Sequence, residues 1–142
     1  EMSCIIKTSK IMIHMKKGGC VMRNDYEQFD IVLVDLGDDF IDGEQGGVRP
    51  CIIVQNNCGN MYSITTLVMP LTKQIKKLNQ PTHTLLRKSQ TNGLTVDSMV
   101  LGECLRQISE KRIIKYIGSI TKTLEKREIK RVYDANFGIG GL

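Results

Sequence analysis

Residues 43–50 read GEQGGVRP, and the arginine in this stretch is suited to bind an anion. Arg49 precedes Pro50, which biases it towards an extended conformation at the start of a strand. Its guanidinium offers a planar fork of donors that fits a phosphate, and it stays charged at any useful pH. Arg49 is therefore a candidate for stabilising charge that develops on a phosphate, and a poor proton acceptor. A solvated arginine at the end of a strand is the alternative interpretation.

A carboxylate and an amide come shortly before this arginine. Glu44 would stay ionised beside a cation, so it is a candidate general base. Carboxylates and amides also hydrogen-bond the edges of nucleobases, so Glu44 and Gln45 are equally candidates for base recognition, and a solvated loop is the third possibility. Because a connection of about ten residues or more without secondary structure is usually functional, we expect a glycine-rich flap that closes over a ligand and brings it to Arg49.

The elements that must hold these residues have the pattern of strands. Runs rich in Ile, Val, Leu and Thr, bounded by Gly, Pro and Asn, are typical of strands. Five or six such runs with no helix between them cannot form a parallel sheet, so we expect a small, strongly curved antiparallel sheet or SH3-like barrel. The expected strands cover residues 29–36, 47–55, 65–72 and 82–86, with one or two more in 96–108, and residues 56–60 are expected to form a turn.

The last quarter of the chain changes to a helical pattern. Ser109 is a suitable N-cap for a helix over residues 110–117 that ends at Gly118, and Thr121 for a second helix over residues 122–137. In the second segment the following apolar residues recur on one expected helical face: Leu124, Ile129, Val132, Tyr133 and Phe137. The expected fold class is therefore α+β, with the strands first and the C-terminal helices docked on them.

Composition limits the class of protein. The 142 residues suffice for one domain with its own core, and 20 Lys and Arg against 15 Asp and Glu give a net charge of +5. This charge favours an anionic partner such as nucleic acid. The five cysteines show no CxxC pair, which indicates reduced thiols in a cytoplasmic protein. No apolar run approaches the roughly 18 residues of a membrane span.

Residues 1–24 stand apart from residues 25–142, which are expected to form the domain. Lys17, Gly18 and Gly19 can be encoded by a purine-rich ribosome-binding sequence shortly before Met22. One hypothesis is that translation begins at Met22 and that the preceding residues are a translated leader. A genuine, mobile N-terminal arm is the alternative.

Six sequence blocks follow one another in a characteristic order and spacing from about Phe29 to Phe137. They read DIVLVDL, GEQGGVRPCIIVQNNCGN, TTLVMPLT, PTH, VDSMVL and GECLRQI. Together they resemble the MazF/PemK family of ribonuclease toxins, and the combination of EQGGVRP with QN is the specific part. The resemblance implies a barrel-like antiparallel sheet with C-terminal helices, a homodimer, a cognate antitoxin as partner, and metal-independent cleavage of single-stranded RNA.

The resemblance assigns catalysis to Arg49 and Thr72. The Thr72 hydroxyl can bond a phosphate oxygen or orient the attacking group; without the resemblance, Thr72 would simply be a β-branched residue that closes a strand. The implied reaction is attack by the RNA 2'-hydroxyl on the adjacent phosphate, which leaves a 2',3'-cyclic phosphate and a 5'-hydroxyl and needs only positioning and charge stabilisation. No metal or cofactor is expected, and His14 and His83 lie far apart in the sequence.

The same family pattern suggests further RNA contacts. Ser98, Glu103 and Arg106 are expected opposite the loop, with a strand-face hydrogen bond and an ion pair as the equally weighted alternative. Lys73 follows Thr72 and can attract the RNA backbone, although lysine runs are more often solvated turns. His83 could stack on a base, but a surface histidine is the simpler interpretation.

Two positions depart from the family pattern. Gly43 stands where serine is usual, and Cys104 stands where an amide is usual. A thiol cannot make the paired hydrogen bonds of an amide, so we expect a different RNA target with cleavage retained. Two alternatives of other classes stay open: a gyrase poison with the same fold, which has no reason to keep Arg49 and Thr72, and a silent module that binds only the antitoxin.

Overall fold

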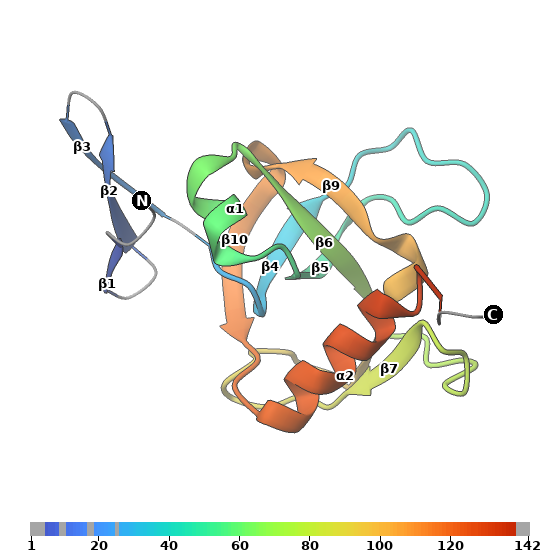
Figure 1. Cartoon of the computed structure of the whole chain (residues 1–142). Coiled ribbons are helices and arrows are strands. Elements are labelled where there is room, and N and C mark those ends of the chain that lie inside the picture. Colours follow the sequence, from blue (N-terminus) through green and yellow to red (C-terminus); the bar gives the residue numbers. More distant parts are fainter. Residues whose placement is uncertain (1–4, 9–10, 17–18, 25, 139–142) are drawn as a thin grey trace.

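The computed structural model describes residues 5–8, 11–16, 19–24 and 26–138. Its first three strands pair antiparallel in the order β1-β2-β3 and share no strand pair with the main sheet (Figure 1). Their bounds are Ile5–Thr8 for β1, Ile11–Lys16 for β2 and Gly19–Asn24 for β3. Met22 lies in β3, and the leader hypothesis stays a prediction.

Seven strands form the main sheet in the order β10-β4-β5-β6-β8-β7, with β9 also paired to β6. Every pair is antiparallel. The strands are β4 (Asp30–Asp35), β5 (Val48–Ile53), β6 (Thr65–Thr72), β7 (His83–Leu86), β8 (Ser98–Leu101), β9 (Arg106–Ser109) and β10 (Ile113–Ser119). With the C-terminal helix α2 (Thr123–Asp134), they confirm the expected α+β class.

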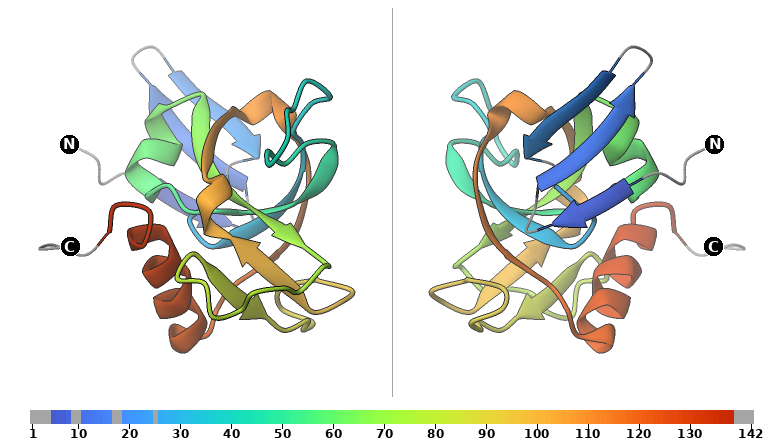
Figure 2. Two further views of the ribbon diagram at one scale, coloured as in Figure 1. Left: turned by 90° about the vertical axis from the view of Figure 1, so that its right-hand side faces the viewer. Right: turned by 90° about the vertical axis from the view of Figure 1, so that its left-hand side faces the viewer.

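The longest strand, β6, makes the sheet bend. Its first half pairs with β9, where Thr66 lies opposite Ile108, and its second half pairs with β8, where Leu71 lies opposite Val100. The 3₁₀ turn η1 (Gly102–Cys104) carries the chain from β8 to β9 between these two halves. The sheet therefore curves strongly around its own concave face (Figure 2).

Apolar side chains alternate between two buried clusters on the two faces of this sheet. Ile31 and Ile52 belong to the first cluster, which also receives Ile129 and Val132 from α2. Val32, which follows Ile31 in β4, belongs to the second cluster on the other face. Because successive strand residues point to opposite faces, the β4 run is apolar at consecutive positions. Fully burying each such side chain contributes about 1.5–3 kcal/mol.

The segment expected as the first C-terminal helix is a strand. Ser109 does act as a cap, because its hydroxyl accepts a hydrogen bond from the Lys111 amide, but only a 3₁₀ turn, η2 (Glu110–Arg112), follows. The chain then enters β10 and pairs with β4. Its β-branched and aromatic residues favour an extended strand, and the open edge of β4 supplies the backbone partners that decide between the two patterns.

The remaining helical predictions need smaller corrections. Helix α2 begins after Lys122, not at a Thr121 cap, and it ends at Asp134. Ile129 and Val132 are buried as expected, whereas Leu124 and Phe137 are exposed. The expected turn over residues 56–60 forms part of a short helix, α1 (Asn57–Tyr62), because the Asn56 side chain accepts a hydrogen bond from the Gly59 amide and caps it.

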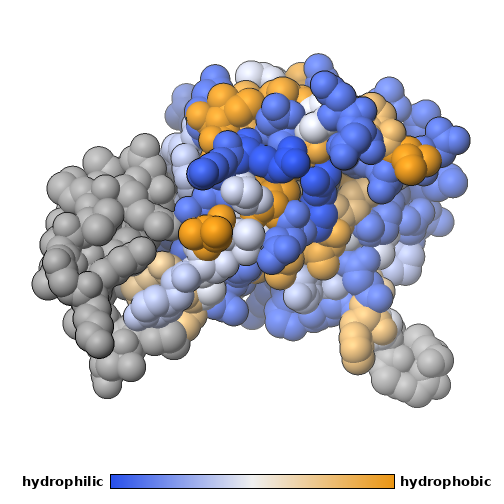
Figure 3. Space-filling model, turned by 90° about the horizontal axis from the view of Figure 1, so that it is seen from above, coloured by the Kyte–Doolittle hydropathy of each residue, from blue (hydrophilic) through white to orange (hydrophobic). Residues whose placement is uncertain are grey.

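The face of the molecule seen from above is mostly hydrophilic (Figure 3). Seen from above, the hydrophobic side chains on that face form separate patches among hydrophilic ones (Figure 3). None of the helices in the described part of the chain is long and apolar enough to cross a membrane.

Gly118 provides a test of the strand assignment. A Cβ atom at this position would lie 2.3 Å from the backbone of Asn92, which cannot move aside easily. We expect Gly118→Ala to lower the free energy of unfolding by about 1–3 kcal/mol because of this overpacking, measured by urea denaturation. Ile114→Ala, on the same strand and exposed, should change it by less than about 0.5 kcal/mol; equal midpoints for both variants would contradict the close approach.

Candidate active site

The register of β5 and β6 brings Arg49 and Thr72 together. The β5–β6 ladder ends where Cys51 lies opposite Pro70, and Arg49 and Thr72 each lie two residues beyond that pair on their own strands. In antiparallel strands, positions equally far beyond a matched pair lie at the same level. Both residues line one pocket of about 580 Å³. The pair expected from the family pattern is therefore adjacent in space.

Both side chains keep unused hydrogen-bond donors. The Arg49 Nε atom donates to the Gly46 carbonyl at 3.1 Å, and no described residue accepts from its terminal nitrogens. The Thr72 hydroxyl oxygen accepts from the Gln74 amide at 3.1 Å, so its proton remains available to donate. Two donors, one of them charged, can thus reach a single anionic group.

The other polar residues of this pocket make it cationic. Lys73 and Ser98, both expected from sequence, line it, and so does Lys115 of β10. Among the described residues that line it there is no Asp or Glu, so we call it the cationic pocket. Ser98 is buried and its hydroxyl donates to the Val96 carbonyl at 3.1 Å. The sequence analysis missed Lys115 because it assigned this segment to a helix.

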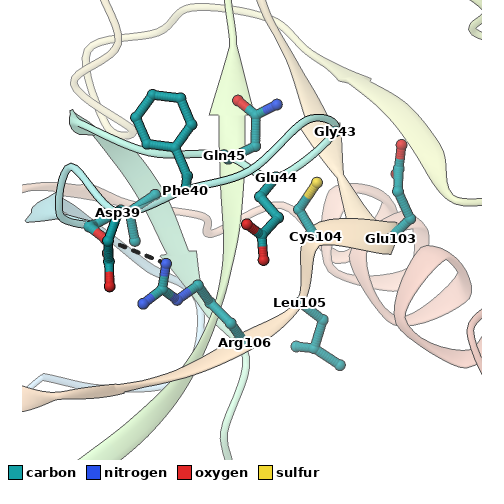
Figure 4. A pocket seen from close by; sticks show the side chains of 10 residues that line it. Asp39, Phe40, Gly43, Glu44, Gln45, Glu103, Cys104, Leu105 and Arg106 are labelled. Atoms are coloured by element: carbon teal, nitrogen blue, oxygen red, sulfur yellow. Dashed lines mark hydrogen bonds between the residues drawn. The ribbon is translucent and has the colours of Figure 1, made fainter.

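The other four predicted residues gather in a second pocket of about 370 Å³ (Figure 4). Glu44 and Gln45 reach it from the 36–47 loop, and Glu103 and Arg106 from η1 and β9. Asp39 supplies a third carboxylate, so we call it the acidic pocket. The eight predicted residues are therefore divided between two pockets of opposite charge.

The carboxylates of Glu44 and Glu103 in the acidic pocket already accept hydrogen bonds within the protein. In Glu44, Oε2 accepts a hydrogen bond from the Ile41 amide within the loop. In Glu103, Oε2 accepts from His83 Nε2 at 2.7 Å and from Gln80 Nε2 at 3.5 Å. The Glu103 carboxylate also has hydrogen bonds with the Thr82 side chain and its own backbone. In Glu44, Oε1 has no donor among the described residues, so this oxygen can accept from a ligand.

Two thiols beside these pockets are held in their protonated form. Burial raises the pKa of Cys51 to about 12, against the opposing charges of Arg49 and Arg106. Burial also raises the pKa of Cys104, the Glu103 charge adds to this effect, and Arg49 opposes it. Because a thiol with a raised pKa is a poor nucleophile, neither supplies covalent chemistry. Arg49 acts on both thiols, so its charge lies where the two pockets meet.

His83 is buried, although the sequence led us to expect a surface histidine. Only 5% of the residue is exposed. Its Nε2 atom contacts Glu103, and its Nδ1 atom lies 3.0 Å from the Lys77 carbonyl. The sequence signal that could have revealed it was the position of His83 at the start of the apolar run 83–86, in the fourth expected strand.

The 36–47 loop is anchored at its base and exposed at its tip. The Leu36 amide donates to the Gly47 carbonyl, the Gly47 amide donates to the Gly37 carbonyl, and the Phe40 ring packs on Gly46. Residues 38–44 are exposed. Closure over a ligand stays a prediction, now confined to these seven tip residues. In the described part of the chain, no three His, Cys, Asp or Glu side chains are grouped to hold a metal ion.

Solved structures share this fold. A mycobacterial endoribonuclease in complex with its cognate antitoxin matches with a TM-score of 0.66 and 20% identity, over 82% of this chain and 99% of that chain. MazF from Deinococcus radiodurans matches with a TM-score of 0.66 and 17% identity, over 81% and 98%. At these identities the likeness shows the fold alone. The fold of this chain is thus one that these two solved structures share.

Sequence similarity identifies the family. The model of the PemK-like, MazF-like toxins of type II toxin-antitoxin systems matches residues 27–135. Endoribonuclease MazF of Staphylococcus saprophyticus is 34% identical over 111 residues, 78% of this chain and 89% of the relative; that of Staphylococcus epidermidis is 35% identical over the same shares. The chain belongs to the PemK/MazF family of toxins, which confirms the resemblance inferred from its sequence blocks.

Gly46→Ala tests the packing of the loop. A Cβ at this position would lie 1.7 Å from a ring atom of Phe40, so the ring must leave its place. An overpacking cost of about 1–3 kcal/mol corresponds to a roughly 5-fold to 150-fold increase in open forms, visible as faster amide hydrogen exchange over residues 38–44. Asp42→Ala, on the exposed tip, is the control and should leave exchange at Leu36 and Gly47 unchanged. Identical exchange in both variants would contradict the packing.

Proposed function

We propose that this chain is an endoribonuclease toxin that acts in the cytoplasm, cleaves single-stranded RNA at short sequences without a metal ion, and is held inactive by a cognate antitoxin. Family membership and relatives named endoribonuclease support this proposal. The observation that carries it is that Arg49 and Thr72 line one pocket, whose described lining residues include no carboxylate. That arrangement suits a phosphate that gains negative charge during reaction.

In the proposed reaction the RNA 2'-oxygen attacks the adjacent phosphorus and the bond from phosphorus to the 5'-oxygen breaks. The 2'-hydroxyl loses its proton, and the leaving 5'-oxygen gains one. The free nitrogens of Arg49 donate to the non-bridging oxygens, whose charge grows in the transition state, and the Thr72 hydroxyl proton donates to the same group. The products are a 2',3'-cyclic phosphate and a 5'-hydroxyl.

The two pockets suit two parts of the RNA. Lys73 and Lys115 can bind the phosphates that flank the reacting one. Glu44, Gln45 and Glu103 offer acceptors that suit the amino groups of a nucleobase. Because Glu44 lines the acidic pocket and not the cationic one, its position supports base recognition over the role of general base. Cys104 in the acidic pocket supports a target that differs from those of relatives with an amide there.

The proposed partners follow from the same surface. An antitoxin with an acidic segment would suit a chain with net charge +5, and the family resemblance implies a homodimer. One structure of the same fold is an endoribonuclease in complex with its cognate antitoxin. We also assign the toxin unit to residues 25–142, since the family model begins at residue 27, and treat residues 1–24 as an extension. The gyrase-poison alternative is not favoured, because the relatives are endoribonucleases and the Arg49–Thr72 pair is kept.

Cleavage of a long defined RNA in excess EDTA tests the proposed function. We expect cuts at one short sequence with 5'-hydroxyl ends, and a loss of about 10²–10³-fold in rate for Arg49→Ala and for Thr72→Ala, because each removes a donor to the developing charge. Arg87→Ala is the matched control, since Arg87 is exposed and pairs only with Asp97 at the surface. No cleavage of several unstructured RNAs by the unaltered chain would favour the silent module.

The salt dependence of RNA binding tests the cationic pocket. With an RNA that carries a 2'-methoxy group at the cleavage site, the logarithm of the binding constant should fall linearly with the logarithm of salt concentration. Each phosphate contact contributes a slope of about 0.7 for single strands, so Lys73→Ala and Lys115→Ala should each reduce the slope by roughly that amount. Lys111→Ala, outside both pockets, should leave it unchanged. An equal slope for all three variants would rule out these contacts.

A further inference from the structure

Both ring nitrogens of the buried His83 face groups that can only accept hydrogen bonds. Nδ1 lies 3.0 Å from the Lys77 carbonyl, and Nε2 lies 2.7 Å from the Glu103 carboxylate. A neutral imidazole carries one N–H, whereas an imidazolium carries two. If the ring were neutral and Glu103 ionised, one ring nitrogen would have no proton, and its lone pair would face the lone pair of an acceptor oxygen. This contact would be costly, because the His83 side chain is almost fully buried.

We propose that His83 is a positioning residue of the RNA site: it carries protons on both ring nitrogens at neutral pH and so holds Glu103 against the acidic pocket. The role of Glu103 in RNA recognition rests on the function proposed above, whereas the protonation of the ring does not. Burial alone would raise the pKa of Glu103, but the hydrogen bond from His83 and further hydrogen bonds outweigh it and lower that pKa below its usual value. Glu103 is therefore the ionised partner.

The contacts of His83 with the Lys77 carbonyl and with Glu103, which we call the clamp, join three segments of the chain. The Lys77 carbonyl accepts from His83 and from the Gln80 amide at 2.9 Å, and Lys77 itself holds a left-handed φ of 53° that side chains rarely adopt. His83 lies at the start of β7, and Glu103 lies in η1 beside Cys104. The ring thus ties the lysine-rich loop after β6 to the turn that forms one wall of the acidic pocket.

The other charged groups near the ring are already paired. From α2, Arg131 donates to the His83 carbonyl at 3.3 Å and forms an ion pair with Glu128 at 2.9 Å. The Lys77 side chain is exposed to solvent. Glu103 is thus the carboxylate that responds directly to the ring proton. If Nε2 loses its proton as pH rises, its lone pair faces a lone pair of Glu103 Oε2 at 2.7 Å. This unfavourable contact would release Glu103 from its place.

Nitrogen NMR of the full chain without RNA tests the protonation. We expect the His83 ring to show two protonated nitrogens at neutral pH, with the His83→Gln spectrum used to separate it from His14. In Glu103→Gln the amide can donate to Nε2 while Nδ1–H still donates to Lys77, so a neutral ring satisfies both contacts. That ring should therefore carry one proton at the same pH. Two protons in this variant, or one in the unaltered chain, would overturn the proposal.

The pH profile of cleavage tests the positioning role. When the ring loses one of its two protons as pH rises, kcat/KM of the unaltered chain should fall about tenfold or more, because the charge-assisted bond to Glu103 is lost. In Glu103→Gln this fall should disappear, whatever the absolute rate. Glu125→Gln, with no hydrogen bond to the ring, should retain it.

The experiments distinguish a failure of the proposed function from a failure of the proposed role of His83. If RNA is cut in an Arg49-dependent manner but the ring carries a single proton, the positioning inference falls and the proposed function stands. If the ring carries two protons but no RNA is cut, the proposed function falls, and with it the role of His83 in RNA cleavage.

Discussion

The antiparallel pairing of β5 with β6 is the constraint on which the site depends. Ile52 and Met69 lie opposite each other in one buried cluster, and Ile53 and Val68 lie opposite each other in the other cluster. Because both faces of these strands are buried, a slip of one residue would exchange every side chain between the clusters. The core therefore fixes the register, and the same register places Arg49 and Thr72 two residues beyond the end of the ladder, where both line one pocket.

Charge is segregated around this fixed pair. The cationic pocket has no carboxylate among its described lining residues, and the acidic pocket has three carboxylates and one guanidinium, that of Arg106. A phosphate backbone needs cations, whereas amino groups of bases need acceptors, and mixing the two would neutralise both. The curvature of the sheet separates them: β10 contributes Lys115 on one side, and η1 and the 36–47 loop contribute the acids on the other. Arg49 lies at the junction.

Two polar side chains outside the pockets, the buried His83 and the exposed Arg131, support this arrangement. His83 and Arg131 connect β7, η1 and α2 through hydrogen bonds to backbone carbonyls and to Glu103. In the described residues, no buried side-chain nitrogen or oxygen lacks a hydrogen-bond partner. Such a network keeps its members in one geometry, since losing any partner leaves a buried group unsatisfied. Polar residues of the site therefore gain their positions from side chains that do not touch a ligand.

The sequence by itself determined the strand content, the antiparallel class and the family. Alternating and continuous apolar runs encode strands locally, and the EQGGVRP block is contiguous, so neither requires knowledge of distant contacts. The sequence also identified eight residues that line the two pockets, but not the charged Asp39 and Lys115. Their division into two pockets of opposite charge was not visible, because it depends on which residues lie across strand pairs far apart in the chain.

Only the tertiary structure decided the elements that depend on distant partners. Residues 113–119 carry a pattern that fits a helix or a strand, and the free edge of β4 selected the strand. His83 could be a surface residue by its neighbours in sequence, and the approach of Glu103, twenty positions later, buried it in a hydrogen-bonded clamp. Local propensity is worth tenths of a kcal/mol per residue, so a complete ladder of backbone hydrogen bonds or a buried charged pair outweighs it.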